Sequence, residues 1–329
     1  MTVASPFGRL FRGSAANYRP GREITHWLLR KGVSLDATRK IVRSFKFLRH
    51  PVSAIDRRLK ARKIVREASN VINLEDGFAP VNFLQLRGAG ELLDELCSMW
   101  IKRCKSGDFD PRYPWSRQPE KTPFLRNCLL ESDLADNQKL IDFVTDPMFV
   151  DTATTYLKSV PILSCVEIWW SPAVDESDQG ENAIVGSQQF HCDLEDDKQL
   201  KFFVYLTDVD ADTGPLTFFS KTDSDQIRQK VGHISGRITD EEIQEAGFAD
   251  KKRLAVAPRG HGFVVDTSNC VHMGSRVTDK ERLVMMIQYV PYNVHREPAG
   301  KMPGACRGED GRQLSDKIED PLRKLVCQP

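Results

Sequence analysis

The sequence lacks several features that would define common protein classes. No stretch approaches the roughly 18 consecutive apolar residues of a membrane-spanning helix. There is no internal repeat and no low-complexity segment, and none of the 8 Cys residues lies in a CxxC pair. This argues against a repeat architecture and against a zinc cluster. Because a chain of 329 residues can bury its own core without disulfides, we expect mostly reduced cysteines in a cytoplasmic protein.

The net charge of +1 hides an uneven distribution of charge along the chain. Residues 1–67 contain 17 basic and 4 acidic residues, a balance of +13, whereas the remainder has a balance of −12. This contrast predicts a boundary near residue 68. With a separate C-terminal tail, we expect three segments. They are a basic helical N-terminal arm at 1–67, a β domain at 68–310 and a helical C-terminal tail at 311–329.

The basic segment predicts helices at about residues 34–49 and 53–67, with Ser34 as an N-cap and Pro51 between them. The first carries an apolar stripe among Lys and Arg residues. We favour packing of this stripe on the acidic remainder. The alternatives are contact of residues 1–67 with an anionic membrane surface or an acidic partner. No nucleic-acid recognition motif accompanies the positive charge. The Arg-rich residues 1–22 also allow a mitochondrial targeting segment, as a weaker alternative to a cytoplasmic location.

The remainder predicts a mainly β fold with flanking helices, an α+β class. Helices are expected at 91–104, 134–145 and 147–158, and a short one near Thr239 within an insertion at 221–258. Short strands separated by Gly, Pro and Asp favour a sandwich or barrel over βαβ units. We expect them at 161–170, 187–193, 200–206, 216–219, 262–265 and 282–290.

The candidate functional residues begin with the segment Phe190-His191-Cys192-Asp193. On a strand, His191 and Asp193 would share a face, because side chains alternate with period 2. With His272 they would form the two-His, one-carboxylate set typical of non-haem Fe(II) oxygenases. Arg282, on the same strand face as Val284, Met286 and Gln288, could grip the carboxylate of a 2-oxo acid co-substrate. The weaker competitors are His261 for the third ligand, the HxE pair His295–Glu297, and Arg276 for the carboxylate.

Four segments together resemble the phytanoyl-CoA dioxygenase family. They are Gln189–Asp193, Thr213–Phe219, Gly260–Asp266 and Cys270–Ser275 followed by Arg282. The resemblance covers about residues 68–295. It implies a double-stranded β-helix (jelly-roll or cupin-like) core and an enzyme that uses Fe(II), 2-oxoglutarate and O2. By it, His191, Asp193 and His272 bind iron, Arg282 binds the C5 carboxylate, and Thr217 or Gln188 lines the 2-oxoglutarate site.

The chain departs from that family after the Gly-Pro turn, at Ser220–Asp225, and between His272 and Arg282, where the family often has Asn and Ser. These changes leave the substrate open, and we expect a small metabolite, lipid-linked or carbohydrate-like molecule. Two alternatives remain. One is a non-oxidative cupin-type isomerase or hydrolase, which has no need of Arg282. The other is a non-catalytic barrel that acts through the basic arm.

Overall fold

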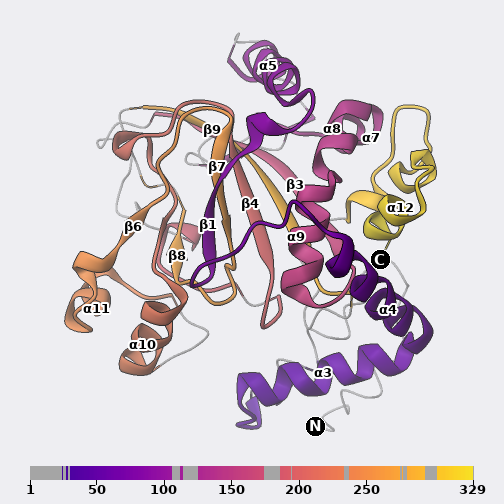
Figure 1. Ribbon diagram of the computed structural model, residues 1–329. Helices are drawn as coiled ribbons and strands as arrows, with labels where there is room; N and C mark the ends of the chain where they lie inside the picture. Colours follow the sequence, from indigo (N-terminus) through magenta and orange to yellow (C-terminus); the bar gives the residue numbers. More distant parts are fainter. Residues whose placement is uncertain are drawn as a thin grey trace, which may run out of the picture.

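A computed structural model provides the structure of the chain, and Figure 1 shows its course. It describes residues 24, 27, 28, 30–105, 112, 113, 125–173, 186–193, 195–232, 237–274, 276, 280–292 and 302–328. The rival pair His295–Glu297 and the arm residues 1–22 lie outside this part of the chain.

Two antiparallel sheets form the centre of the described structure (Figure 1). The large sheet has the order β1 (Phe78–Asn82), β7 (His261–Val265), β4 (Leu200–Tyr205), β9 (Arg282–Val290), β3 (Ile162–Ser171), β2 (Arg126–Asn127). The small sheet has the order β6 (Arg253–Leu254), β5 (Thr217–Phe218), β8 (His272–Met273). Along the chain, β3 and β4 belong to the large sheet and β5 and β6 to the small sheet, and β7, β8 and β9 then alternate between the two. This agrees with the winding expected of a jelly roll, and the prediction of a mainly antiparallel β fold with helices is confirmed.

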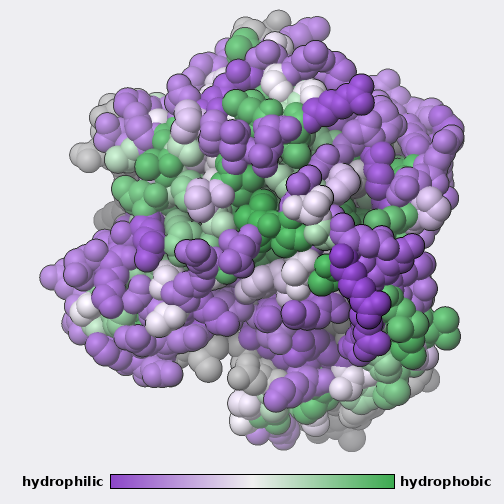
Figure 2. Space-filling model, in the orientation of Figure 1, coloured by the Kyte–Doolittle hydropathy of each residue, from purple (hydrophilic) through white to green (hydrophobic). Residues whose placement is uncertain are grey.

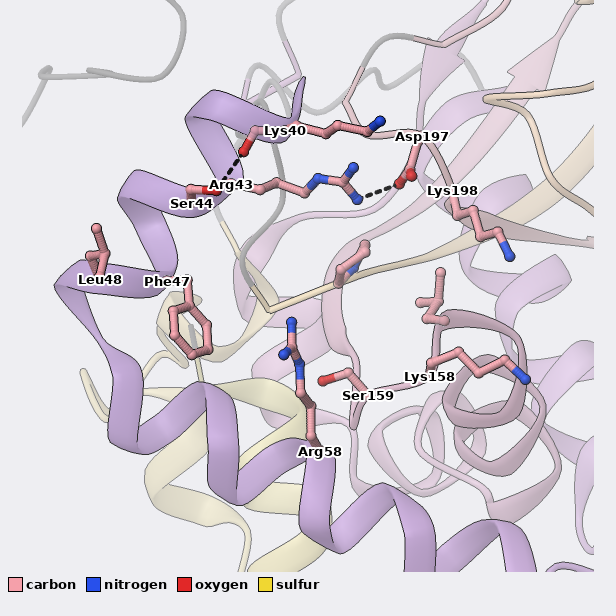
Figure 3. Close-up of a pocket in the computed structure, with 12 residues that line it drawn as sticks. Lys40, Arg43, Ser44, Phe47, Leu48, Arg58, Lys158, Ser159, Asp197 and Lys198 are labelled. Atoms are coloured by element: carbon pink, nitrogen blue, oxygen red, sulfur yellow. Dashed lines mark hydrogen bonds and ion pairs between the residues drawn. The ribbon is translucent and has the colours of Figure 1, made fainter. Parts of the chain in front are cut away.

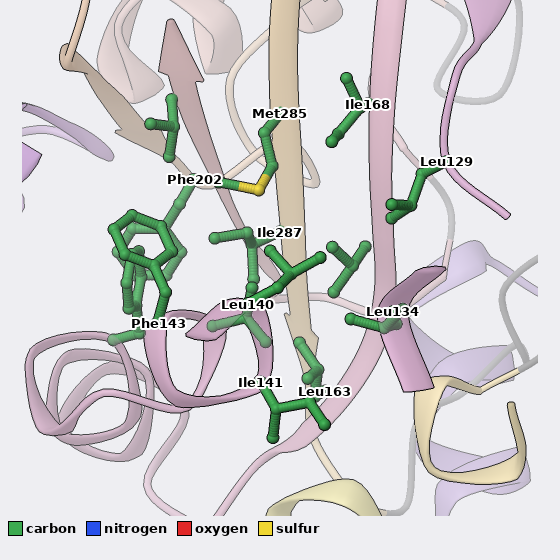
Figure 4. Packing of buried hydrophobic residues seen from close by; sticks show 14 of the residues in the cluster. Leu129, Leu134, Leu140, Ile141, Phe143, Leu163, Ile168, Phe202, Met285 and Ile287 are labelled. Carbon is green, nitrogen blue, oxygen red and sulfur yellow. The ribbon is translucent and has the colours of Figure 1, made fainter. Parts of the chain in front are cut away.

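The central strands of the large sheet are buried on both faces. Their side chains alternate between the two faces and so belong to two separate apolar clusters. On β9, Leu283, Met285 and Ile287 face a helical layer, whereas Val284 and Met286 face the small sheet. Figure 4 shows the helical side, where side chains of α8 (Gln138–Val144) pack on β3, β4 and β9. The inner face of β9 also carries the polar residues Arg282 and Gln288, so the space between the sheets is not purely apolar.

Helices cover the outer face of the large sheet, and two others lie beside the small sheet. The sheet is covered by α7 (Glu131–Asp136), α8 and α9 (Pro147–Leu157), and α5 (Ala89–Trp100) lies at one end (Figure 1). The insertion forms α10 (Lys221–Val231) and α11 (Asp240–Glu245), beside the small sheet. The predicted capping box at Thr239 is present, since its hydroxyl accepts from Glu242 N and its own N–H donates to the Glu242 carboxylate.

One predicted strand is wrong. Residues 187–193 do not form a continuous strand, because Gly186–Gln188 is a short 3-10 helix and only Phe190 and His191 make isolated bridges. After this 3-10 turn the segment lies beside the small sheet, where His191 pairs with His272. The inference that two residues on one strand share a face therefore does not explain how His191 and Asp193 meet.

The predicted N-terminal helices are α3 (Leu35–Arg49) and α4 (Pro51–Glu67), and Ser34 caps the first. Helix α4 is fastened to the rest of the molecule by Arg57, whose buried guanidinium donates to the carbonyls of Val160, Pro161, Leu325 and Gln328. Two of these belong to the segment around α12 (Pro321–Cys327). Residues of the predicted arm and of the predicted tail therefore contact each other; the division into three segments stays a prediction.

We predict that Arg57→Ala lowers the free energy of unfolding by roughly 3 kcal/mol, because it leaves several buried carbonyl oxygens without their donor. Urea unfolding measures the change. Arg62→Ala, on the exposed side of the same helix, is the matched control and should shift stability by less than about 0.5 kcal/mol. Equal effects of the two substitutions would show that α4 is not held through Arg57.

Candidate metal centre

The backbone brings together the three side chains predicted as metal ligands. His191 and His272 exchange two backbone hydrogen bonds, both 2.9 Å long, between the segment after the 3-10 turn and strand β8. The Asp193 N–H donates to the Thr267 carbonyl at 2.9 Å. One ligand atom from each of His191, Asp193 and His272 then lies within 4.8 Å of the others. Among the residues that the structure describes, this is the only such group of His, Cys or carboxylate side chains.

The imidazoles are oriented so that both Nε2 atoms face Asp193. His191 Nε2 lies 3.7 Å from Oδ1 and His272 Nε2 lies 3.7 Å from Oδ2 of this carboxylate. On the other side of the rings, His191 Nδ1 lies 2.8 Å from the Gln189 carbonyl and His272 Nδ1 lies 2.9 Å from the Cys270 carbonyl. Since a carbonyl can only accept, each Nδ1 must carry the proton. The Nε2 lone pairs are then free for a metal, as in many protein metal sites.

Burial and charge keep the three groups in the protonation state that a metal requires. Burial, with the charge of His272, lowers the pKa of His191 to about 3. Burial also lowers the pKa of His272. Burial opposes ionisation of Asp193, but Lys201 and the two histidines outweigh it and hold its pKa below the ordinary value. Near neutral pH the cluster therefore presents two neutral imidazoles and one carboxylate.

The sequence analysis missed two residues that fix Asp193. Lys201 Nζ lies 2.8 Å from Asp193 Oδ2, and Gln199 Nε2 donates to the same oxygen at 2.9 Å and to Thr267 Oγ1 at 2.8 Å. Asp193 in turn raises the pKa of Lys201 against the opposing effect of burial. The sequence did contain a signal, because Lys201 is the one charged residue in the apolar strand Leu200–Tyr205. A lysine buried in such a strand requires an anionic partner.

The turn that supplies Thr267 is itself held rigidly. The buried Asp266 carboxylate accepts from Tyr156 Oη, from the Ser268 N–H at 3.1 Å and from Asn269 Nδ2 at 2.7 Å. Thr267 thus has a fixed position from which its carbonyl and hydroxyl hold Asp193 and Gln199. The metal-ligand geometry therefore extends into a network that ends on helix α9, where Tyr156 lies.

Arg282 lies at the start of β9, on the inner face of the large sheet, and is only 4% exposed. Its Nε has no hydrogen-bond partner among the described residues. Burial lowers its pKa, and only Tyr205 acts in the opposite direction. A buried guanidinium without a carboxylate is costly, so this residue is suited to an anionic ligand that enters from outside the chain.

The remaining predicted residues are placed as follows. Thr217 lies opposite Met273 on β5, and its neighbour Phe218 lies opposite His272, so Thr217 belongs to the other face of the small sheet. The Gln188 side chain is buried in the turn that precedes His191. Arg276 pairs with Asp240 at 2.7 Å and donates to the Gln188 carbonyl at 3.0 Å, which separates it from Arg282. His261, on β7, is not part of the metal-ligand group.

Comparisons with known proteins were made with both the sequence and the structure. No family model matches the chain, and no curated protein matches its sequence. Among solved structures, SnoN, a "non-heme alpha ketoglutarate dependent epimerase" from nogalamycin biosynthesis, is 16% identical over 76% of this chain and 91% of SnoN, with a TM-score of 0.44. EctD from S. alaskensis is 13% identical over 69% of this chain and 82% of EctD, with a TM-score of 0.44.

EvdO2 from Micromonospora carbonacea var. aurantiaca, solved with 2-oxoglutarate, is 14% identical over 74% of this chain and 94% of EvdO2, with a TM-score of 0.41. Similarity at this level assigns neither a family nor an activity to this chain. In the part of the chain that the structure describes, no helix is both long and apolar enough to cross a membrane.

We predict that the metal-free protein loses stability as the pH falls below 6.5. The unfolded chain protonates His191 at its ordinary pKa of 6.5, whereas the folded chain does so only near 3. The contribution of His191 to the loss should be roughly 2 kcal/mol at about pH 5. Urea unfolding with a chelator, at about pH 7 and about pH 5, measures it. His191→Gln should reduce the pH dependence and His261→Gln should not; an unchanged pH dependence in His191→Gln would contradict a buried neutral His191.

Proposed function

We propose that this protein is a non-haem Fe(II)- and 2-oxoglutarate-dependent dioxygenase that hydroxylates a small-molecule substrate. His191, Asp193 and His272 would hold the iron, and Arg282 would bind the C5 carboxylate of 2-oxoglutarate. The metal-ligand fit rests on the three converging side chains and on the free Nε2 lone pairs described above. This set leaves part of the metal coordination open for the co-substrate and O2.

The observation that carries the proposal is the buried Arg282, whose Nε has no hydrogen-bond partner among the described residues, on the inner face of the sheet that carries Lys201. Lys201 already has Asp193, and Glu167 interacts with it from the same inner face, whereas Arg282 has no carboxylate partner among the described residues. A dicarboxylate co-substrate supplies the missing anion, and a planar guanidinium can grip its far end through two hydrogen bonds. A cupin-type isomerase or hydrolase and a non-catalytic barrel both leave Arg282 without a use.

When bound, the iron would couple decarboxylation of 2-oxoglutarate to oxidation of the substrate by O2, giving succinate, CO2 and the hydroxylated product. The chain's own residues bind and orient the metal ligands. Gln199 and Lys201 hold one oxygen of Asp193, and the Gln189 and Cys270 carbonyls hold the imidazoles. The presence of the Asp193 carboxylate among the metal ligands favours hydroxylation. We propose that the substrate is a small metabolite, lipid-linked or carbohydrate-like molecule.

We predict that anaerobic addition of Fe(II) and 2-oxoglutarate produces the weak visible absorption band of a 2-oxo acid bound to iron. Arg282→Ala should weaken 2-oxoglutarate binding by about a hundredfold, because it removes a charge-assisted pair of hydrogen bonds. Iron binding should be retained, since Arg282 is not a ligand. Titration of the band gives the affinity for 2-oxoglutarate, and metal analysis gives the iron content.

The matched control for this experiment is Arg276→Ala, which removes the rival guanidinium and should leave the affinity for 2-oxoglutarate within about threefold of the wild type. His191→Ala should abolish both iron binding and the band. An iron-loaded protein without the band contradicts the proposal. Loss of iron in Arg282→Ala would instead assign Arg282 a structural role.

A further inference from the structure

A cavity lies against Asp197 and Lys198, in the chain segment that precedes β4. It has a volume of about 740 Å³ and lies between α3, α4 and the end of α9. Figure 3 shows the basic residues that line it: Lys40 and Arg43 on α3, Arg58 on α4, and Lys158 and Lys198 on the opposite wall, with their ammonium groups directed away from α3. A cavity with this lining selects for negative charge.

Most of these cations have no acidic partner. The one carboxylate that lines the cavity, Asp197, is bound by Arg43 at 2.7 Å. Within the described structure, Lys40, Arg58, Lys158 and Lys198 take part in no ion pair. Two of them lie against aromatic rings: the Arg58 guanidinium lies 5.3 Å from the ring centre of Phe47 and Lys198 Nζ lies 5.0 Å from that of Tyr156. Four cations around the cavity therefore have no compensating carboxylate in the described part of the chain.

Next to this cavity, α3 and α4 expose a row of large apolar side chains. Leu48, which lines the cavity, is 71% exposed and Val52, at the start of α4, is 79% exposed. The row follows helical spacing along both helices and consists of Ile41, Phe45, Leu48, Val52, Ile55 and Leu59. In Figure 2, green patches interrupt the purple surface at the lower edge of the molecule, where Figure 1 places these helices. Exposed basic residues flank the row, among them Arg49, Arg62, Lys63 and Arg66.

The backbone conformation of Lys158 is independent evidence for a binding role of the cavity. This residue ends α9 in the left-handed conformation, with φ = 61°, and it is one of two non-glycine residues with positive φ among the described residues. Glycine or asparagine usually occupies such a position, because other side chains are strained there. The lysine therefore lowers the stability of the fold while it keeps a positive charge at the wall of the cavity, which is typical of a binding residue.

We propose that the surface formed by α3, α4 and the basic cavity docks on an anionic phospholipid bilayer. The cavity takes a lipid phosphate, and the apolar row enters the boundary between head groups and acyl chains. A bilayer is the occupant that offers negative charge and an apolar layer side by side, which matches this surface. A soluble phosphate compound leaves the apolar row exposed to water, and an acidic protein surface does not match six large apolar side chains. This inference does not depend on the proposed catalytic activity.

The test is partition of the full chain onto vesicles of phosphatidylcholine alone and onto vesicles that also contain phosphatidylserine, followed by sedimentation. We expect binding to the anionic vesicles and much weaker binding to the neutral ones, with loss of binding at high salt. Since each Lys or Arg near the surface contributes about fivefold, the double reversal Lys40→Glu/Lys198→Glu should weaken partition at least about thirtyfold. The matched control is Arg87→Glu/Lys139→Glu on a distant surface, which should change it much less.

Two further variants separate the contributions. Leu48→Ser/Val52→Ser should weaken binding to anionic vesicles at least tenfold (about 0.8 kcal/mol per buried CH₂), whereas Ile101→Ser, which removes an exposed apolar residue elsewhere, should not. Lys158→Gly should weaken vesicle binding and at the same time raise the melting temperature, because glycine relieves the strained backbone. A purely structural role of Lys158 predicts no loss of vesicle binding.

Several outcomes would overturn the proposal. One is equal binding to neutral and anionic vesicles, and another is undiminished binding of the Leu48→Ser/Val52→Ser variant. Protection from thermal unfolding by inositol hexakisphosphate, without any vesicle binding, would assign the cavity to a soluble phosphate compound. Binding to a polyglutamate peptide, without vesicle binding, would assign the surface to an acidic protein.

Discussion

The backbone pairing of His191 with His272 is the contact on which the candidate metal centre depends. It joins the turn before Asp193 to the two-residue strand β8, and it sets two imidazoles side by side with ring centres 4.4 Å apart. Thr267 then holds the third ligand through the backbone of Asp193. Because β8 also pairs with β5, the small sheet supports the site, and the ligands do not rest on an isolated loop.

The second constraint is the balance of buried charge between the two sheets. Asp193, Lys201 and Arg282 project into an interior that also holds other polar side chains, among them Glu167 and Gln288, between apolar ones such as Met286. Asp193 and Lys201 compensate each other, and the carboxylate has further donors and imidazoles around it. Arg282 has no comparable partner among the described residues. This asymmetry separates a site ready for an anionic ligand from a purely structural ion-pair network.

The N-terminal helices are part of the packed molecule and also form its most distinctive surface. Arg57 holds α4 against Val160 and the C-terminal segment, while the opposite side of the helix pair carries the exposed apolar row. The segment from Asp197 to Lys201 links this surface to the metal centre. Its first residues line the basic cavity, and Gln199 and Lys201 hold Asp193. One short segment therefore contributes residues to both places.

Local rules were sufficient for much of the structure. The run at 282–290 predicted β9, and period-2 alternation predicted which of its residues share a face with Arg282. Ser34 and Thr239 marked helix starts, and Pro147 marked the first turn of α9. They failed at residues 187–193, where a 3-10 turn and two bridges replace a strand, and at β8 and β6, which are too short to give a periodic signal. A strand of only two residues forms because a neighbouring strand pairs with it, and this pairing is decided by the tertiary structure.

The sequence by itself determined the chemical inventory: two histidines and an aspartate with suitable spacing, a distal arginine, and an excess of positive charge near the start of the chain. Only the tertiary structure decided between equivalent residue types. It paired Arg276 with Asp240, left Arg282 buried with no carboxylate partner in the described part of the chain, and placed Lys201 on Asp193. It also buried Arg57 while Arg58, the next residue, faces the basic cavity. Burial and charge pairing depend on residues that are distant in the chain, so local composition and spacing do not encode them.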